Sequence, residues 1–214
     1  MDRQLTQTEV RVLGSLIEKE LTTPDNYPLS LNALTNACNQ SSNRDPVMQL
    51  AEDAVAAAVE GLRQQNLARV IKTSGSRVNK YQHLMDTRMD LEPAEVAVMC
   101  TLMLRGPQTV GELRTRSERL HAFDSLESVE KTLNVLMVRN PPIAARLPRH
   151  PGQKEQRYAQ LLAGEVVWEE PVTAAPRVHV DADRIGKLEE TVAELRQEVG
   201  DLRKELEGFR KQFE

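Results

Sequence analysis

Aromatic residues are scarce in this sequence, because three Phe, one Trp and three Tyr make up only 3% of its 214 residues. A core with so few aromatic side chains must consist mostly of Leu, Val, Ala and Met, which favours helices over a β-sandwich. Long hydrophobic runs are missing too. The longest one, Val96 to Leu104 with Thr101 inside it, is far shorter than the roughly 20 residues that a membrane span needs. We therefore expect no contact with a membrane.

Cysteine is almost absent. Cys38 and Cys100 are too few and too far apart for a disulfide framework, and the first ten residues, MDRQLTQTEV, lack the apolar region of a signal peptide. Both features predict a protein of the reducing cytoplasm. Each cysteine lies in an apolar helical stretch, where a buried structural thiol is expected more often than a nucleophile or a redox sensor.

Motifs of catalysis and cofactor binding are also missing. The sequence contains no CxxC pair and no glycine-rich nucleotide loop of the GxxxxGK[ST] or GxGxxG type. Its four histidines form no HxxxH pair; they are His83, His121, His150 and His179. We therefore expect a protein that is not an enzyme and that needs neither a metal nor a cofactor.

The formal net charge of −4 is spread unevenly along the chain. Residues 1–92 carry −2, residues 93–164 carry +3 and residues 165–214 carry −5. A binding partner responds to the local electrostatic field rather than to the net charge of the whole chain. Because most of the negative charge lies in the C-terminal segment, the first 164 residues could still carry a surface that binds nucleic acid.

An internal repeat is the clearest pattern in the sequence. Five positions recur at a constant offset of 86, and the pairs are Leu5 and Leu91, Glu9 and Glu95, Val10 and Val96, Val12 and Val98, and Leu16 and Leu102. Each half then ends in a similar strand-like phrase, KYQHL at 80–84 and RYAQL at 157–161. A repeat of about 80 residues is too long for a solenoid unit, so it predicts two related domains.

In the first half, the capping box from Thr6 to Glu9 predicts a helix that ends before Pro24. Ser30 is placed to cap a second, shorter helix. A third helix carries a buried stripe and ends near Asn66; the stripe consists of Ala51, Val55, Ala58, Val59 and Leu62. Residues 67–72 and 77–84 form a predicted hairpin around the turn TSGS. Three helices and a hairpin are the order of a winged helix-turn-helix domain, predicted here for residues 1–90.

The second half, residues 91–164, predicts the same order. Pro93 is suited to the first turn of a helix, and Thr109 opens a second capping box. Ser125 or Asp124 starts a third helix with the stripe Leu126, Val129, Leu133 and Leu136. Residues 143–149 and 157–162 form the second hairpin. The predicted fold is thus mainly α within the α+β class, with tandem winged helix-turn-helix domains followed by a C-terminal coiled-coil helix.

After residue 164 the helical pattern lapses. Pro171 and Pro176 forbid a continuous helix, so residues 165–183 are predicted as a linker. Residues 184–214 follow a heptad pattern that favours a parallel homodimer, with a seam of Ile185, Leu188, Val192, Leu195, Val199, Leu202 and Leu206. The alternative is that this amphipathic helix packs on its own core.

The sequence also resembles a known family. The phrases LTQTEVRVLGSLIEKELTTPDNYPLSLNALTNACNQSSNRDPVM, AEVAVMCTLMLRGPQTVGELRTR and QRYAQLLAGEV are similar to those of the YceH family of bacterial proteins, over about residues 4–166. This resemblance implies a tandem winged-helix fold and a cytoplasmic bacterial protein. It implies no activity, because the members of that family are largely uncharacterised.

Double-stranded DNA is the first predicted partner, because winged helices place their third helix in the major groove and their hairpin on the backbone. Ten basic residues could contact nucleic acid: Arg44, Lys72, Arg77, Lys80, Arg114, Arg116, Arg146, Arg149, Lys154 and Arg157. For the hairpin residues the alternative is a solvated face. For Arg44 the alternative is a loop-fastening role, with Asp45 or a carbonyl as its partner.

The charge of the two third helices argues against sequence reading. Their exposed positions include Glu52, Asp53, Glu60 and Arg63 in the first half, and Glu127, Glu130 and Lys131 in the second. Carboxylates repel phosphates, so DNA binding would fall to hairpins and loops. The second hypothesis is a protein-interaction adaptor. The acidic third helices favour it, and so does Trp168, which could anchor a partner. The alternative for Trp168 is docking on its own domain.

Overall fold

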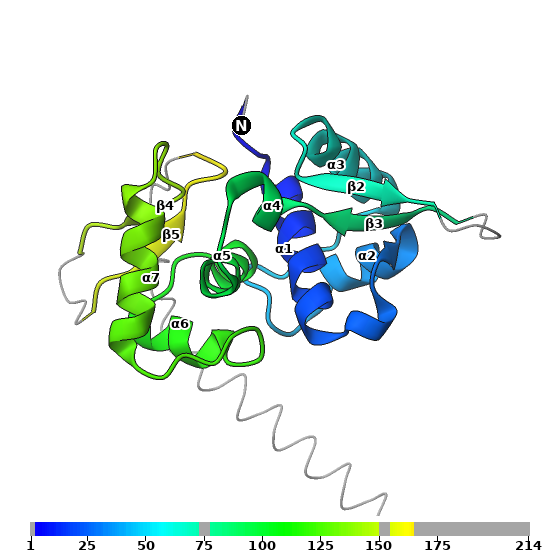
Figure 1. The fold of residues 1–214 in the computed structure, drawn as a ribbon. Helices are drawn as coiled ribbons and strands as arrows, with labels where there is room; N and C mark the ends of the chain where they lie inside the picture. The colour runs from blue at the N-terminus through cyan, green and yellow to red at the C-terminus, as the bar shows by residue number, and fades with distance from the viewer. Residues whose placement is uncertain (1–2, 73–77, 150–154, 165–214) are drawn as a thin grey trace, which may run out of the picture. The chain divides into compact units, whose positions relative to one another are not determined.

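The computed structural model describes residues 3–72, 78–149 and 155–164. The chain divides into two compact units, Met1–Trp168 and Glu169–Glu214. The two predicted domains, 1–90 and 91–164, therefore share the first unit (Figure 1). Trp168, the predicted linker and the predicted coiled-coil seam lie outside the described residues.

The first half of the unit contains three main helices and a small sheet. Its elements are α1 (Gln7–Thr22), the 3-10 helix η1 (Pro24–Asn26), β1 (Leu29–Ser30), α2 (Leu31–Cys38), α3 (Glu52–Gln64), β2 (Ala68–Ile71), β3 (Lys80–His83) and the short α4 (Met85–Met89). The predicted starts of α1 and α2 are confirmed. The backbone N–H of Glu9 donates to the Thr6 hydroxyl at 3.1 Å, and the Ala33 N–H donates to the Ser30 hydroxyl at 3.3 Å.

The second half repeats this order. Its elements are α5 (Pro93–Arg105), α6 (Val110–Ser117), α7 (Leu126–Val138), β4 (Ala144–Arg146) and β5 (Tyr158–Gln160). Pro93 stands in the first turn of α5, and Thr109 and Ser125 cap α6 and α7 through their side chains. The chain is thus an α+β protein, with about half of its described residues in helices and with small antiparallel sheets.

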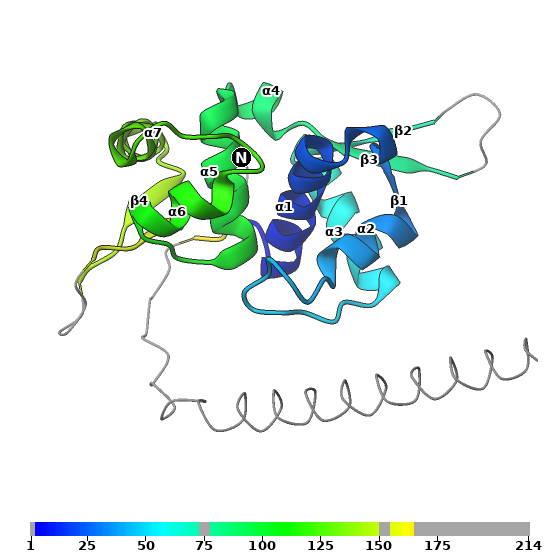
Figure 2. The same cartoon turned by 90° about the horizontal axis from the view of Figure 1, so that it is seen from below.

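Each half closes with antiparallel strands. In the first half the strand order is β1-β3-β2, with Leu29 opposite Tyr81 and Ile71 opposite Lys80. In the second half β4 pairs with β5, and a single bridge joins Gln108 to Tyr158. The segment before the second helix therefore pairs with the last strand in both halves. Figures 1 and 2 show the two hairpins on opposite sides of α1 and α5.

Helices α1 and α5 form the contact between the halves. They lie side by side in the centre of the unit (Figures 1 and 2), and all ten repeat residues from Leu5 to Leu102 are buried. Gly14 lies at the closest approach, because a Cβ at this position would lie 3.0 Å from Leu104 Cδ2. The Cys100 thiol donates to the Gly14 carbonyl at 3.4 Å. Gly14 and Cys100 are themselves 86 positions apart, so equivalent residues of the repeat touch each other.

Some details differ from the sequence-based expectations. Neither β1 nor α4 follows from hydrophobic periodicity, because β1 has two residues and α4 has five. The predicted buried stripe of each third helix includes one residue that is exposed in the structure. Ala51 is the exposed N-cap of α3, and Leu126 is 48% exposed in the first turn of α7, where the helix has not yet reached the core.

Candidate nucleic-acid interface

The first hairpin presents its cations to solvent. Lys72 directly follows β2 and is exposed, and the half-buried Lys80 lies in register with Ile71 at the start of β3. Arg69 is exposed as well, and its guanidinium donates to the Gln82 side-chain oxygen at 2.9 and 3.1 Å. The predicted contact Arg77 lies outside the described residues.

The second hairpin holds its cations in two different ways. Arg149 is exposed, and so is Arg146, whose guanidinium carbon lies 5.6 Å from the centre of the Tyr158 ring. Arg157, by contrast, donates to the Pro107 carbonyl at 2.9 Å and to the Glu112 carboxylate at 2.7 Å. The predicted contact Lys154 lies outside the described residues.

Glu112 explains why two of the predicted cations are not free. Its carboxylate lies 2.7 Å from Arg157 and 3.4 Å from Arg116. Burial alone would raise the pKa of the Glu112 carboxyl. The Thr109 N–H and the two guanidinium groups outweigh burial and hold that pKa below its ordinary value. Arg157, which directly precedes β5, therefore braces that strand against α6, whereas Arg116 pairs with Glu112 within α6.

Arg114 has a bracing role of the same kind. Its guanidinium donates to the backbone carbonyls of Phe123 at 3.3 Å and Asp124 at 3.2 Å, just before α7. The residue remains exposed, so its charge still reaches solvent. It fastens the turn between α6 and α7 and can add only a diffuse positive field.

Arg44 is not on the surface, which favours the loop-fastening alternative over a DNA contact at this position. Its side chain is fully buried, and its two terminal nitrogens lie 3.1 and 2.6 Å from the oxygens of Glu18. It also donates to the carbonyls of Ala37 and Asn43. The loop-fastening alternative describes this geometry, with Glu18 in the place expected for Asp45. A buried, fully bonded guanidinium cannot meet a phosphate without unfolding the loop.

The pKa of Glu18 reflects this pair. Burial on its own would raise the pKa of the Glu18 carboxyl, because it disfavours the charged form. The hydrogen bonds and the charge of Arg44, together with Lys19 at 3.5 Å, hold that pKa below its ordinary value. The pair fixes the loop between α2 and α3, whose Asp45 N–H donates to the Leu104 carbonyl of α5 at 2.9 Å.

A basic groove that the sequence analysis missed lies beside this loop. It has a volume of about 430 Å³, and four cations line it: Lys19, Arg105, Arg116 and Arg119. Burial and the nearby guanidinium groups of Arg116 and Arg44 lower the pKa of Arg105, so positive charge is crowded here. The four residues come from three parts of the chain, namely α1, the end of α5, and α6 with the residues that follow it. One signal could have found them, since Lys19 and Arg105 occupy equivalent positions of the repeat, 86 residues apart.

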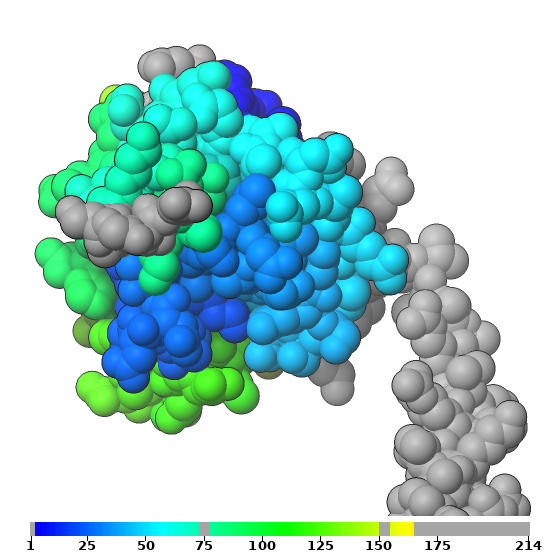
Figure 3. All heavy atoms as spheres, turned by 90° about the vertical axis from the view of Figure 1, so that its right-hand side faces the viewer, coloured from blue at the N-terminus to red at the C-terminus, as the bar shows by residue number. Residues whose placement is uncertain are grey.

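The exposed faces of the third helices carry little positive charge. Helix α3, seen on the face shown in Figure 3, exposes three carboxylates and pairs Arg63 with Glu60. Helix α7 exposes Glu127 and Glu130 beside Lys131. It also exposes three aliphatic side chains; these are Leu126 at 48%, Val135 at 46% and Val138 at 80%. The sequence analysis missed the exposure of Leu126 because it placed this residue in the core.

Both cysteines are buried, as expected for structural thiols. Burial raises the pKa of the Cys38 thiol and that of the Cys100 thiol, which keeps both protonated near neutral pH. No helix in the described part of the chain is both long enough and apolar enough to span a bilayer. Within residues 3–72, 78–149 and 155–164, no three His, Cys, Asp or Glu side chains gather in a cluster that could hold a metal ion.

These observations define an α+β protein whose two halves repeat one element order. The sequence model of the family described as "Protein of unknown function, DUF480" matches residues 5–153. The chain is 55% identical over 195 residues to the UPF0502 protein of Geotalea daltonii, covering 89% of each chain. It is 54% identical over 198 residues to the UPF0502 protein of Pelobacter propionicus, covering 90% of each. The UPF0502 protein of Solibacter usitatus is 53% identical over 195 residues, which cover 90% of this chain and 93% of the relative.

The chain therefore belongs to the DUF480 family, whose relatives in these bacteria carry the name UPF0502. This confirms the resemblance at the level of an uncharacterised bacterial family. The YceH name and the tandem winged-helix architecture stay predictions.

Proposed function

We propose that the two halves are winged-helix domains and that the protein is a non-enzymatic, cytoplasmic DNA-associated regulator that binds duplex DNA through phosphate contacts. The repeated order of three helices and a hairpin supports this fold. So does the pairing of the segment before the second helix with the last strand, at Leu29 in one half and at Gln108 in the other.

One observation carries the proposed function, and it is the separation of charge between hairpins and helices. In a chain of net charge −4, residues 67–84 hold four basic residues and no acidic one, and residues 143–162 hold four basic residues and one acidic one. The exposed faces of α3 and α7 are acidic or apolar instead. Phosphates would therefore be drawn to the hairpins and repelled by the helices.

This distribution predicts binding with little sequence preference. Phosphate contacts position a protein on DNA, whereas base contacts in the major groove specify the sequence. Lys72, Lys80, Arg146 and Arg149 form no ion pair with a carboxylate of residues 3–72, 78–149 or 155–164. The basic groove around Lys19 and Arg105 adds a second positive surface.

Two variants of equal net charge test the proposal. The first reverses charge on the hairpins, with Lys72→Glu and Arg149→Glu. The second reverses charge on the third helices, with Arg63→Glu and Lys131→Glu. All four residues are exposed, so both variants should keep the fold. Because the hairpins lie on opposite sides of α1 and α5 (Figure 2), Lys72→Glu and Arg149→Glu are also measured one at a time.

The assay is a fluorescence-polarisation titration of a random duplex at low and moderate salt. We expect wild-type binding to weaken steeply as salt rises, and we expect each hairpin reversal to reduce the slope of log K against log[salt] by about 0.9. The helix variant should bind like wild type. A larger loss in the helix variant would overturn the hairpin assignment, and a wild type that does not bind at low salt would overturn the proposed function.

The exposed aliphatic residues of α7 favour a second candidate, a protein-interaction adaptor. Val135 and Val138 lie three positions apart on one side of a helix that is not cationic, and neighbouring exposed apolar side chains can mark a contact surface. Here the partner would be another protein, captured by wild type and not by the variant Val135→Asp with Val138→Asp. A C-terminal homodimer is compatible with either candidate and rests on the heptad pattern alone.

A further inference from the structure

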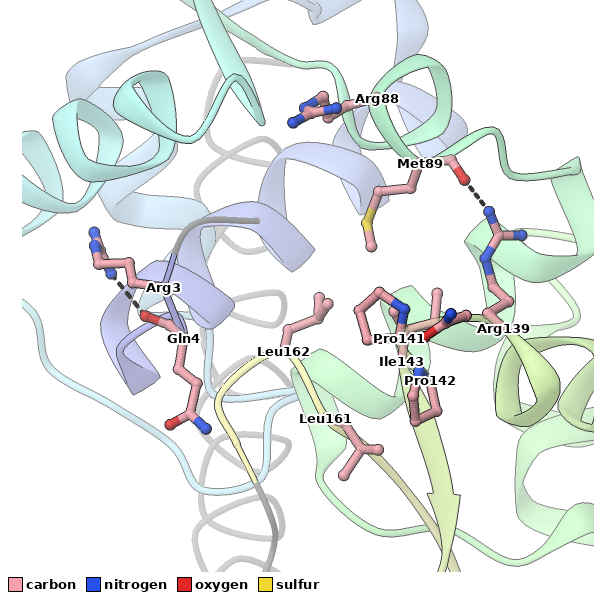
Figure 4. Close-up of a pocket in the computed structure, with 11 residues that line it drawn as sticks. Arg3, Gln4, Arg88, Met89, Arg139, Pro141, Pro142, Ile143, Leu161 and Leu162 are labelled. Atoms are coloured by element: carbon pink, nitrogen blue, oxygen red, sulfur yellow. Dashed lines mark hydrogen bonds between the residues drawn. The ribbon is translucent and has the colours of Figure 1, made fainter.

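A second cavity, away from the turns of both hairpins, lies between the N-terminal segment, α4, the connection from α7 to β4 and the end of β5 (Figure 4). Its volume of about 550 Å³ is within the range of small-molecule sites. Its walls come from both halves of the repeat. These walls are held together by a backbone hydrogen bond of 2.8 Å from the Leu5 N–H to the Leu162 carbonyl.

The lining of this cavity combines an apolar wall with cations. Met89, Pro141, Pro142, Ile143, Leu161 and Leu162 form the apolar part. Arg3, Arg88 and Arg139 stand on three sides of it (Figure 4). Among the described lining residues there is no carboxylate. An apolar cavity with a few polar groups at its edge can hold a ligand, and here those groups are all positive or neutral.

The three arginines differ in whether their guanidinium groups already have partners in the protein. Arg3 is paired with the buried Glu9 carboxylate. Arg139 donates to the Met89 carbonyl and lies 3.6 Å from the Glu95 carboxylate. The guanidinium of Arg88 has no hydrogen-bond or ion-pair partner among the described residues. Arg88 is therefore the cation that is available to a ligand.

We propose that this cavity binds a small organic carboxylate with an apolar body, either an aliphatic acid of medium length or an aromatic acid. The carboxylate would accept hydrogen bonds from Arg88, with Arg139 adding positive potential from beside Met89. The hydrocarbon body would lie against Met89, Leu161 and Ile143, and removing its apolar surface from water would favour binding. A polyanion such as a nucleotide does not fit this chemistry, because its polar atoms would face an apolar wall without hydrogen-bond partners.

Ligand binding here would be independent of the proposed DNA contacts. None of the described cavity residues belongs to the predicted DNA-contacting set. The cavity lies at the start of β4 and at the end of β5, whereas the hairpin turn lies at the other end of these two strands. A ligand would touch Arg88 of the first half and Ile143 of the second at once. It would therefore stabilise the contact between the halves.

The test is an NMR titration of the uniformly 15N-labelled full chain with octanoate, with 4-phenylbutyrate as the aromatic arm and octanamide as the uncharged counterpart of octanoate. We expect saturable shifts of the amides of Met89, Ile143 and Leu162 with at least one acid. The amides of Lys19 and Arg105, in the basic groove, should not follow. The acid that saturates at the lower concentration identifies the preferred body.

Charge dependence is tested with two arginine variants. Arg88→Gln should weaken binding of the acid about tenfold and leave the melting temperature unchanged, because no described residue depends on that guanidinium. Arg63→Gln, on the exposed face of α3, is the matched control and should bind like wild type. The proposal is overturned if neither acid saturates, if octanamide binds as tightly as octanoate, or if Arg88→Gln retains wild-type affinity.

Discussion

The buried pair of Glu18 and Arg44 allows a quantitative prediction for Glu18→Gln. Arg44 is fully buried and donates to both Glu18 oxygens, so removing the carboxylate leaves a buried guanidinium without its counter-charge. Breaking such a pair costs about 3–5 kcal/mol. The Glu18 side chain is 12% exposed, and Arg44 keeps two carbonyl partners, so we expect about 3 kcal/mol. In a chain of this size that corresponds to a fall of roughly 6–12 °C in melting temperature.

Urea denaturation of the full chain at pH 7 measures this loss, and the thermal melt checks it. Glu60→Gln removes the exposed partner of Arg63 and is the matched control, with an expected change below about 1 kcal/mol. A loss of less than about 1 kcal/mol for Glu18→Gln would refute the reasoning, because the pair would then not behave as a buried one.

The same pair predicts a dependence on pH. The folded chain holds the pKa of Glu18 below its ordinary value, so the unfolded chain takes up the proton first as the pH falls. The stability from this carboxylate is therefore complete above the ordinary pKa of a glutamate and is lost as the pH falls through the lowered one. The difference between wild type and Glu18→Gln should shrink on acidification. A difference that is the same at pH 3 and pH 7 would contradict this account.

Three further predictions concern the contact between halves, the thiols and the C-terminal segment. Gly14→Ala should destabilise the unit by about 1–3 kcal/mol in urea denaturation, because the new methyl group would lie 3.0 Å from Leu104. Gly111→Ala, whose methyl group would meet nothing closer than 4.0 Å, should not. The Cys38 and Cys100 thiols should stay unreactive toward Ellman's reagent in the native chain and react fully in urea; rapid native labelling would contradict their burial. Truncation after Trp168 should turn a dimer into a monomer in size-exclusion chromatography with light scattering, and a truncated protein that stays dimeric would remove the coiled coil as the cause.

Most of the element order could be predicted from local signals. Capping boxes at Thr6 and Thr109 and prolines such as Pro93 act through neighbouring backbone groups, so their effect can be recognised from a few consecutive residues. The repeat offset of 86 added a long-range signal. In the structure both copies of the pattern are buried.

The candidate site was harder to predict, because exposure and pairing depend on tertiary contacts. Arg44 was grouped with the hairpin cations on its polar sequence neighbours, and its burial follows from the position of Glu18, 26 residues away. Glu112 likewise neutralises Arg157 across 45 positions. Sequence alone places such residues near other polar groups and does not show which carboxylate lies within reach.

The touching pair Gly14 and Cys100 has a consequence for the repeat. Contact between equivalent residues is what a two-fold relation between the halves would produce, as in the interface of a symmetric homodimer. Each half therefore covers the apolar face of the other's first helix. The inner face of each half is constrained by its counterpart, whereas the outer faces differ, with carboxylates on α3 and exposed aliphatic side chains on α7.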